Sequence, residues 1–316
     1  MYLDVPSFQI LRARVINRVV NQPALMGYEV RFVVVDDTGG LDPEIASLES
    51  YEDVLVVQPP FNLGHQRAIV YALRKTAVHI DDEDLVVTMD ADGEDAPEDV
   101  PRLLAELLNA PFDRAVVLAY RTKRSESLAF KLFYAGFRTA FRLLTGTAVR
   151  SGNFAAYRGW VARRVLAHPH FDLCYSSTLT SLNLALRFVP CARATRFAGQ
   201  SRMSYGKLIQ HGVSMLMPYL DRIAIRALIL FSAIAAASVV MALAVVGIKI
   251  GTDRAIPGWA TATLLALVVS SLVSLGNFVL LFAVYSQSRG LSLSQLEQET
   301  YGSTRSTPAE ADRTFS

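Results

Sequence analysis

The chain has 316 residues, 52% of them hydrophobic, and a formal net charge of +2 at neutral pH. This length fits one large domain or two smaller ones, and the composition is more apolar than that of an ordinary soluble protein. The basic residues are not concentrated in an aromatic-rich tract, so the sequence does not indicate nucleic-acid binding. Cys174 and Cys191 show neither metal-ligand spacing nor a disulfide framework, which agrees with a reducing compartment.

Short apolar runs alternate with helical patterns in the first half of the chain. The runs are continuously apolar, as buried strands are, and they cover residues 31–35, 54–57, 85–87 and 115–118. Residues 67–78 and 97–108 lie between them and have apolar positions at helical spacing. Because strand and helix alternate, we predict an α/β fold in which helices cover both faces of a mainly parallel sheet.

Polar segments follow three of the predicted strands. Asp36 and Asp37 begin the segment after the first strand, residues 62–67 lie between the second strand and its helix, and Asp90 begins the segment after the third. Ligands of such sheets bind beyond the carboxyl ends of the strands. We therefore expect the three segments to converge on one binding site.

The third of these segments is the most informative, because two aspartates one residue apart end an apolar run. Alternate residues of a strand point to opposite faces, so Asp90 and Asp92 can hold one cation only where the strand turns into a loop. Gly93 permits that turn. Hard divalent ions such as Mg²⁺ and Mn²⁺ take carboxylate oxygens and substrate phosphates as ligands. The pattern predicts a metal-held diphosphate site, and a solvated acidic loop is the alternative.

Two segments further along the chain have helical patterns. Residues 130–144 place three phenylalanines on one stripe, which is typical of a helix face packed on the core. Residues 207–226 mix apolar positions with charged ones, as a helix lying in the membrane interface does. A packed linker helix would have the same pattern.

Two long stretches near the C-terminus, residues 227–248 and 255–288, contain no residue with a formal charge. Each exceeds the roughly 20 apolar residues that a membrane-spanning helix needs, so we predict two transmembrane helices joined as a hairpin. Both outer ends of a hairpin lie on one side of the membrane, and basic residues such as Arg222 and Arg289 flank them there. Because basic residues next to membrane spans favour the cytoplasmic side, we predict an integral protein of the inner membrane whose N-terminal region is cytoplasmic. Two buried helices of a soluble protein are the alternative.

Four motifs occur in a fixed order before this hairpin, at residues 34–39, 62–68, 89–98 and 196–203. Their order and the hairpin that follows resemble family 2 glycosyltransferases of the GT-A fold, a Rossmann-like α/β fold. The resemblance is to the polyprenyl-phosphate glycosyltransferase branch, which includes dolichol-phosphate mannose synthase and bactoprenol glucosyltransferase. It implies inverting transfer of a sugar from a nucleotide sugar to a polyprenyl phosphate. The Gln-x-x-Arg-Trp motif of processive synthases is absent, so one sugar per acceptor is expected.

The resemblance also implies roles for individual residues. Asp36 and Asp37 would contact the base or ribose of the nucleotide, and Asp90 with Asp92 would hold Mg²⁺ or Mn²⁺ against its diphosphate. The nucleotide side of the site would be lined by Asn62, His65 and Arg67. The residues expected to grip the acceptor phosphate or the leaving diphosphate are Arg121, Lys131, Arg196, Ser201 and Arg202. Arginine suits such sites because it binds phosphate bidentately, although a solvated surface role is the alternative for each basic residue.

Asn153 bears on the chemistry of the acceptor. We expect it to act in catalysis together with Asp92 and Arg121, and related enzymes often have an acidic residue at its position. An alcohol acceptor needs a general base, whereas a lipid phosphate is already an anion near neutral pH. Asparagine at this position therefore favours a polyprenyl phosphate over an alcohol.

The start of the chain departs from the family pattern. The family usually opens with an apolar strand that ends in a Pro-x-Tyr-Asn-Glu-like motif, and here Tyr2 and Asp4 would be the remnant of that motif. We therefore expect a catalytic domain over residues 1–206 that lacks its first strand. The other expected parts are an interfacial helix over residues 207–226, two transmembrane helices over residues 227–288 and a polar tail over residues 289–316.

Two other functions stay open. One is a glycosyltransferase that acts on another membrane lipid, such as diacylglycerol. The other is an inactive, truncated homologue that scaffolds a membrane complex, which the missing first strand favours. The resemblance further suggests self-association through the spans, as a homo-oligomer.

Overall fold

The computed structural model describes residues 4–121, 128–148, 152–172, 174–192, 194–197, 205–251 and 258–288. These residues fall into two compact units. Within the described ranges, the first unit contains residues 4–139 and 148–218, and the second contains residues 140–147 and 219–288. The predicted remnant residue Tyr2 lies outside the described part of the chain.

Strands in the described part of the first unit form two sheets. The strands are β1 (Phe32–Val35), β2 (Val54–Val57), β3 (Leu85–Thr88), β4 (Ala115–Arg121), β5 (Ala155–Arg158) and β6 (Ala185–Cys191). The strands β1 and β2 pair in parallel, and the other sheet has the order β3-β5-β4-β6. In this second sheet β5 runs antiparallel to both of its neighbours, whereas β4 and β6 are parallel.

The predicted α/β fold is confirmed, but the four-stranded sheet is mixed rather than mainly parallel. The difference comes from β5, whose short Ala-Ala-Tyr-Arg sequence has little of the continuous apolar character from which β1 to β4 were predicted. All four of its residues are nonetheless buried or half-buried, because helices pack on both sides of this strand.

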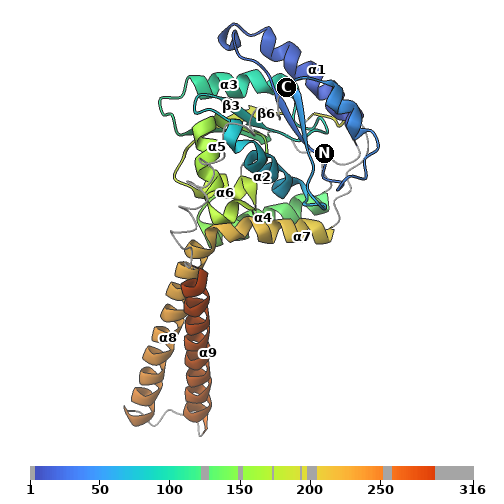
Figure 1. The fold of residues 1–316 in the computed structure, drawn as a ribbon. Coiled ribbons are helices and arrows are strands. Elements are labelled where there is room, and N and C mark those ends of the chain that lie inside the picture. Colours follow the sequence, from blue (N-terminus) through green and yellow to red (C-terminus); the bar gives the residue numbers. More distant parts are fainter. Residues whose placement is uncertain are drawn as a thin grey trace. The chain divides into compact units, whose positions relative to one another are not determined.

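Helices cover both faces of the four-stranded sheet (Figure 1). Val117 of β4 joins a core with α1 (Val5–Val20) and α3 (Val100–Leu108). Its neighbour Val116 joins the opposite core, with α2 (His65–Thr76), α5 (Gly159–Leu166) and α6 (Tyr175–Ser181). Both valines are fully buried. This alternation follows from the two-residue period of a strand, and it confirms the predicted helices on both faces.

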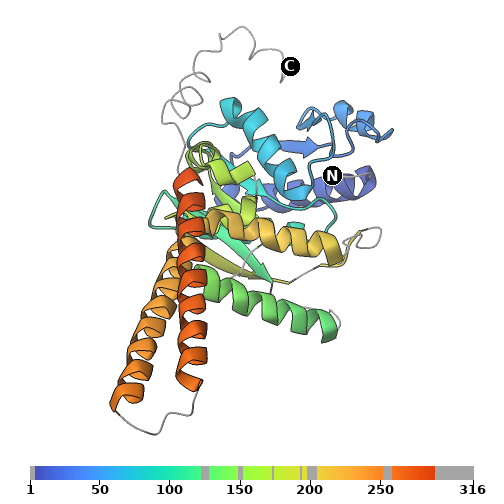
Figure 2. The same cartoon turned by 90° about the horizontal axis from the view of Figure 1, so that it is seen from below.

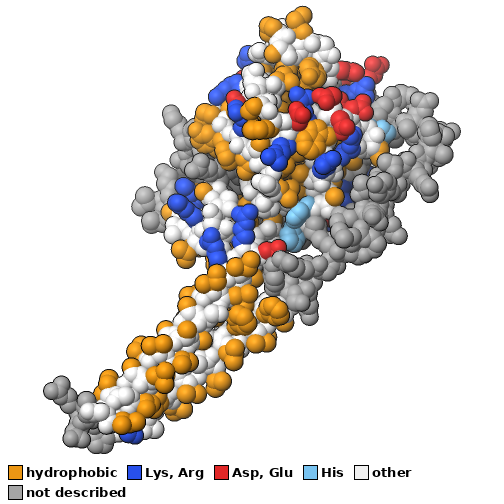
Figure 3. All heavy atoms as spheres, turned by 90° about the vertical axis from the view of Figure 1, so that its left-hand side faces the viewer, with side chains coloured by type: hydrophobic (Ala, Val, Ile, Leu, Met, Phe, Trp, Pro, Cys, Tyr) orange, Lys and Arg blue, Asp and Glu red, His pale blue; other side chains and the backbone are white. Residues whose placement is uncertain are grey.

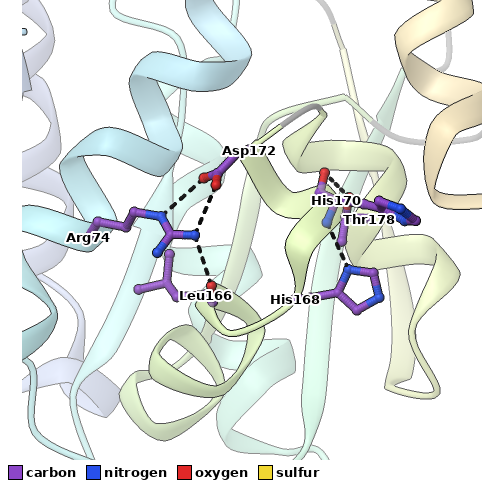
Figure 4. Close-up of polar contacts among 6 residues, drawn as sticks. All are labelled: Arg74, Leu166, His168, His170, Asp172 and Thr178. Carbon is purple, nitrogen blue, oxygen red and sulfur yellow. Dashed lines mark hydrogen bonds and ion pairs between the residues drawn. The ribbon is translucent and has the colours of Figure 1, made fainter. Parts of the chain in front are cut away.

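The segment between α5 and α6 is tied to α2 (Figure 4). The Arg74 guanidinium donates from Nε and Nη2 to the two carboxylate oxygens of Asp172, at 3.0 and 3.1 Å, and also to the carbonyl of Leu166 at 3.1 Å. The Thr178 hydroxyl of α6 donates to the carbonyl of His170 at 3.1 Å. These contacts hold the start of α6 beside α2.

Two further helices belong wholly or partly to the first unit. The helix α4 (Leu128–Thr145) begins in the first unit and ends in the second. The helix α7 (Tyr205–Leu216) packs on it, since an added Cβ at Gly212 would lie 3.0 Å from the Phe137 ring of α4. The predicted interfacial segment, residues 207–226, therefore comprises most of α7, a short 3-10 helix (Met217–Tyr219) and the start of α8.

The second unit is dominated by α8 (Leu220–Gly251) and α9 (Trp259–Ser288), which lie side by side (Figures 1 and 2). Small residues such as Ser238 are buried in the pair, and its hydroxyl lies 3.5 Å from that of Ser270. The exposed side chains of the hairpin are mostly hydrophobic (Figure 3). The segments Ile209–Gly251 and Trp259–Val284 have mean hydropathies of 2.6 and 2.3 and are long enough to cross a bilayer. They are candidate membrane spans.

Gly159, the first residue of α5, lies where the helix meets the turn before β3. A Cβ added there would approach the carbonyl oxygen of Asp81 to 1.9 Å. We expect Gly159→Ala to lower the free energy of unfolding by about 1–3 kcal/mol, the typical cost of overpacking a buried position. In the control Gly136→Ala, in α4, the added Cβ meets no atom within 4 Å, so this change should be neutral or stabilising. Thermal unfolding of the protein in detergent compares the two, and equal melting temperatures would contradict the close approach.

Candidate active site

The segment after β1 contains a buried carboxylate with one unused oxygen. Asp36 is 1% exposed, and its Oδ1 accepts hydrogen bonds from the backbone N–H and the hydroxyl of Thr38, at 3.1 and 2.6 Å. Its Oδ2 is buried and has no hydrogen-bond donor among the described residues. A buried carboxylate oxygen without a donor is costly, so a ligand that brings an N–H or O–H group would stabilise it.

Asp37 holds the neighbouring loop in place. Its two carboxylate oxygens accept from the backbone N–H groups of Leu63 and Gly64, at 2.6 and 2.9 Å, and its carbonyl accepts from the Asn62 side chain at 2.7 Å. The predicted nucleotide residues Asp37 and Asn62 therefore contact each other's loops. His65 begins α2 directly after this loop, and its ring lies 5.5 Å from that of His211 in α7, centroid to centroid.

The loop after β3 brings Asp90 and Asp92 close together. Gly93 has a φ of +85°, the left-handed conformation that favours glycine, and it turns the chain directly after Asp92. The backbone N–H of Glu94 donates to Asp92 Oδ1 at 3.0 Å, and that of Asp90 donates to Asp95 Oδ2 at 3.0 Å. Burial raises the pKa of Asp92; the Glu94 N–H opposes this, and the nearby Asp90 charge raises the pKa further.

A short segment from another part of the chain covers this loop. Arg196 donates from Nη2 to Asp92 Oδ2 at 3.0 Å and from Nε to Glu94 Oε1 at 2.7 Å. The backbone N–H of Phe197 donates to the carbonyl of Asp92 at 3.0 Å. A Cβ on Gly93 would lie 2.6 Å from the Phe197 ring, so only glycine fits beneath it.

These residues fit a hard divalent cation. The donor set consists of carboxylate oxygens, Asp90 and Asp92 repel each other in the absence of a cation, and the Arg196 guanidinium already places positive charge on Asp92. Oxygen ligands of this kind, with substrate phosphates completing the shell, are what Mg²⁺ and Mn²⁺ prefer. Among the described residues, no group of three or more His, Cys, Asp or Glu side chains forms a cage for a metal.

Asn153 lies in the same site as Asp90. Its Nδ2 donates to Asp90 Oδ1 at 3.3 Å, and its Oδ1 accepts from the side chain of Gln66. Gln66 was not among the residues predicted from the sequence, although it belongs to the predicted nucleotide motif at residues 62–68. The feature that marks Gln66 as a site residue is its burial in the first turn of α2, and burial becomes visible only in the structure.

The remaining predicted residues are not all brought into this site. Arg67 is exposed on α2. Arg121 ends β4, but its side chain, like that of Lys131 in α4, is outside the described part of the chain. Ser201 and Arg202 also lie outside it.

Residues 13–166 match the family model described as Glycosyl transferase family 2. The matched region contains β1 to β5 and both aspartate loops, whereas Arg196 lies beyond its end. No curated protein matches the chain. Residues 13–166 are therefore similar to family 2 glycosyltransferases, and two candidate membrane spans follow them in the chain.

Asp92 should destabilise the fold when it is ionised. Because its pKa is raised above the ordinary 3.8, the folded state binds this proton more tightly than the unfolded chain, and stability falls as pH rises through the raised pKa. We expect Asp92→Asn to raise the melting temperature at pH 7 in the presence of a chelator. The gain should shrink as the pH falls through the raised pKa of Asp92, because the wild-type carboxyl then becomes protonated. Thermal unfolding from pH 4 to pH 7 measures the difference, and a gain that grows on acidification would reverse the assigned shift.

Proposed function

We propose that this protein is a membrane-anchored, inverting glycosyltransferase that moves one sugar from a nucleotide sugar to a polyprenyl phosphate at the cytoplasmic face of the inner membrane. The observation that carries the proposal is the contact of Asp92 with Arg196 inside the site of a family 2 domain. A carboxylate pair suited to a divalent cation and a guanidinium suited to a phosphate meet there.

The donor is a nucleotide sugar, as the family 2 domain implies. The buried Oδ2 of Asp36 would accept a hydrogen bond from the base or ribose, in place of the donor it lacks among the described residues. Asp37 would act indirectly, because it fixes the loop that carries Asn62 and Gly64. His65 and Arg67 would line the nucleotide from the first turn of α2.

Asp90 and Asp92 would hold Mg²⁺ or Mn²⁺. A bound ion of this kind would supply electrostatic stabilisation to the nucleoside diphosphate as it leaves. Arg196 would release Asp92 and Glu94 when the cation binds, and its guanidinium would then be available to phosphate oxygens. The remaining contacts with the two anionic substrates would come from Arg121, Lys131, Ser201 and Arg202.

The acceptor follows from the chemistry of Asn153. Its amide cannot act as a general base, and both ends of it are used, by Asp90 and by Gln66. A phosphate oxygen attacks the anomeric carbon without such a base, because it is already ionised near neutral pH. The bond to the leaving diphosphate breaks as the new bond forms on the opposite face of the sugar, which inverts the configuration.

The candidate spans support a lipid acceptor, since an enzyme held at the bilayer meets lipid headgroups directly. The basic residues at the outer ends of the hairpin favour a cytoplasmic domain. Self-association through the hairpin, as a homo-oligomer, is part of the same proposal.

We expect the purified protein to transfer radiolabelled sugar from nucleotide sugars into organic-extractable lipid in the presence of Mn²⁺ or Mg²⁺. Asp92→Ala should lower the rate by about 100-fold or more, because electrostatic stabilisation of the leaving group is lost. Asp113→Ala, at an exposed position before β4, is the matched control and should match the wild type. Equal transfer by the wild type and Asp92→Ala would refute the metal role.

The product of this assay separates the acceptor classes. A sugar phosphate on a polyprenyl chain is labile to mild acid, whereas a glycoside of diacylglycerol is not. A scaffold without activity would show neither product and no metal-dependent binding of nucleoside diphosphates.

Asp36→Asn should weaken binding of nucleoside diphosphates. It replaces an ionised acceptor with an amide, and hydrogen bonds to charged groups contribute about 1.5–3 kcal/mol, or roughly 10- to 100-fold in affinity. Calorimetric titration with UDP and with GDP, each with Mn²⁺, measures the change. The control is Asp53→Asn, which changes the carboxylate partner of Arg12 directly before β2 and should leave the affinity unaltered. Equal affinities of Asp36→Asn and the wild type would rule out a nucleotide contact for Asp36.

A further inference from the structure

A chain of buried hydrogen bonds leads from α6 to the acidic loop. It begins at the backbone N–H of Ser176, which donates to Gln66 Oε1 at 3.1 Å. Gln66 then donates from Nε2 to Asn153 Oδ1, and Asn153 donates from Nδ2 to Asp90 Oδ1 at 3.3 Å. Gln66, Asn153 and Ser176 are all buried, so water does not compete for these groups.

The backbone of α6 determines which way both amides point. A side-chain amide can be turned by half a rotation, and its orientation is established by its partners. The Ser176 N–H can only donate, so the oxygen of Gln66 must face it and the nitrogen must face Asn153. Asn153 must then present its oxygen to Gln66, which leaves its nitrogen directed at Asp90.

Both ends of this chain are held in place by other contacts. The Thr88 hydroxyl, at the end of β3, donates to the carbonyl of Asn153 at 2.7 Å and is bonded to the Tyr175 hydroxyl at 2.6 Å. The start of α6 is held beside α2 by the Arg74–Asp172 pair (Figure 4). Asn153 therefore cannot turn its amide without losing bonds to fixed partners.

We propose that Gln66 is a positioning residue for the cation site, and that it acts through Asn153. By fixing Asn153 as a donor, it places a hydrogen bond on Asp90 Oδ1 and orients that carboxylate. Without Gln66, the oxygen of Asn153 loses its donor, and the amide is no longer held in the position from which it donates to Asp90. This inference rests on the proposed function, since it concerns the cation that Asp90 and Asp92 would hold.

A purely structural role would have a different signature. Gln66 also satisfies an N–H in the first turn of α6, which has no partner within that helix. Losing that bond lowers the melting temperature, but it does not by itself change how the folded protein binds a cation. Cation affinity therefore separates the two roles.

The test measures Mn²⁺ binding to the full chain in detergent, by electron paramagnetic resonance of free Mn²⁺, with excess GDP and in a parallel series with excess UDP. The variants are Asn153→Ala, Gln66→Met and the double variant. Each single change should weaken Mn²⁺ binding about tenfold, the lower end of what partners of metal ligands contribute. The double variant should bind no more weakly than Asn153→Ala alone, because Gln66 acts only through Asn153.

A kinetic readout accompanies the binding series. The Mn²⁺ concentration for half-maximal sugar transfer should rise in both single variants, and in Gln66→Met kcat at saturating Mn²⁺ should stay within about twofold of the wild type. Tyr157→Phe is the matched control, because it removes a buried hydroxyl 3.1 Å from that of Tyr175, at the end of the network away from Asp90. It should lower the melting temperature without changing Mn²⁺ affinity.

The outcomes separate this inference from the proposed function. Asp92→Ala should abolish Mn²⁺ binding, and if the wild type binds no Mn²⁺, the metal role falls and this inference falls with it. If the wild type binds Mn²⁺ and Asp92→Ala does not, wild-type affinity in Asn153→Ala overturns this inference alone. Additive losses in the double variant would also overturn it, since they would mean that Gln66 acts by another route. Wild-type affinity in Gln66→Met would overturn it as well. Should Gln66→Met not fold, Gln66→Glu takes its place, because it keeps the acceptor for the Ser176 N–H and removes the donor to Asn153.

Discussion

The acidic loop after β3 is the constraint on which the rest of the site depends. Residues 90–95 contain four carboxylates, and their mutual repulsion together with burial makes the ionised loop costly. The structure offsets this cost with donors from several parts of the chain: the N–H of Glu94, the amide of Asn153 and the guanidinium of Arg196. A divalent cation would offset it further, which is why a loop of this composition is suited to metal and phosphate chemistry.

The strands that precede the two aspartate segments share one core of the first unit. The strands β1 and β3 belong to different sheets, yet both contribute to the core formed with α1 and α3. The opposite core, with α2, α5 and α6, brings Gln66 towards Asn153 at the entry to β5. Positions in the site are thus set by packing on both faces of the sheet, and side chains that meet there are far apart in the sequence.

The second unit shows how the end of α4 is attached to the first candidate span. Arg226 donates to the carbonyl of Leu143 at 2.5 Å, and Arg222 donates to the Thr147 hydroxyl at 3.2 Å. Carbonyls in the last turn of a helix have no partner within the helix, so an arginine from α8 stabilises this end of α4. The same two arginines are among the basic residues that precede the first predicted span in the sequence.

Local sequence patterns determined much of the fold. Continuous apolar runs located β1 to β4, helical spacing located α2 and α3, and long charge-free stretches located the two candidate spans, because each pattern reflects burial along a single element. They failed for β5, which is too short and too weakly apolar to stand out, and for β6, whose apolar run is interrupted by Arg187 and Pro190. The Asp-x-Asp motif with Gly93 was also visible in the sequence, since the turn it needs is a property of adjacent residues.

Contacts between distant residues were decided only by the tertiary structure. Both Asp36 and Asp37 were predicted from the sequence to contact the nucleotide. In the structure Asp36 has a buried oxygen without a donor among the described residues, whereas Asp37 accepts a hydrogen bond from the loop that contains Leu63. The pairing of Arg196 with Asp92, across about a hundred residues of chain, has no local signal. Nor does the orientation of Asn153, which depends on a backbone N–H of α6 acting through Gln66. Sequence patterns report which residues are buried or turned; which donor meets which acceptor depends on how separate elements pack.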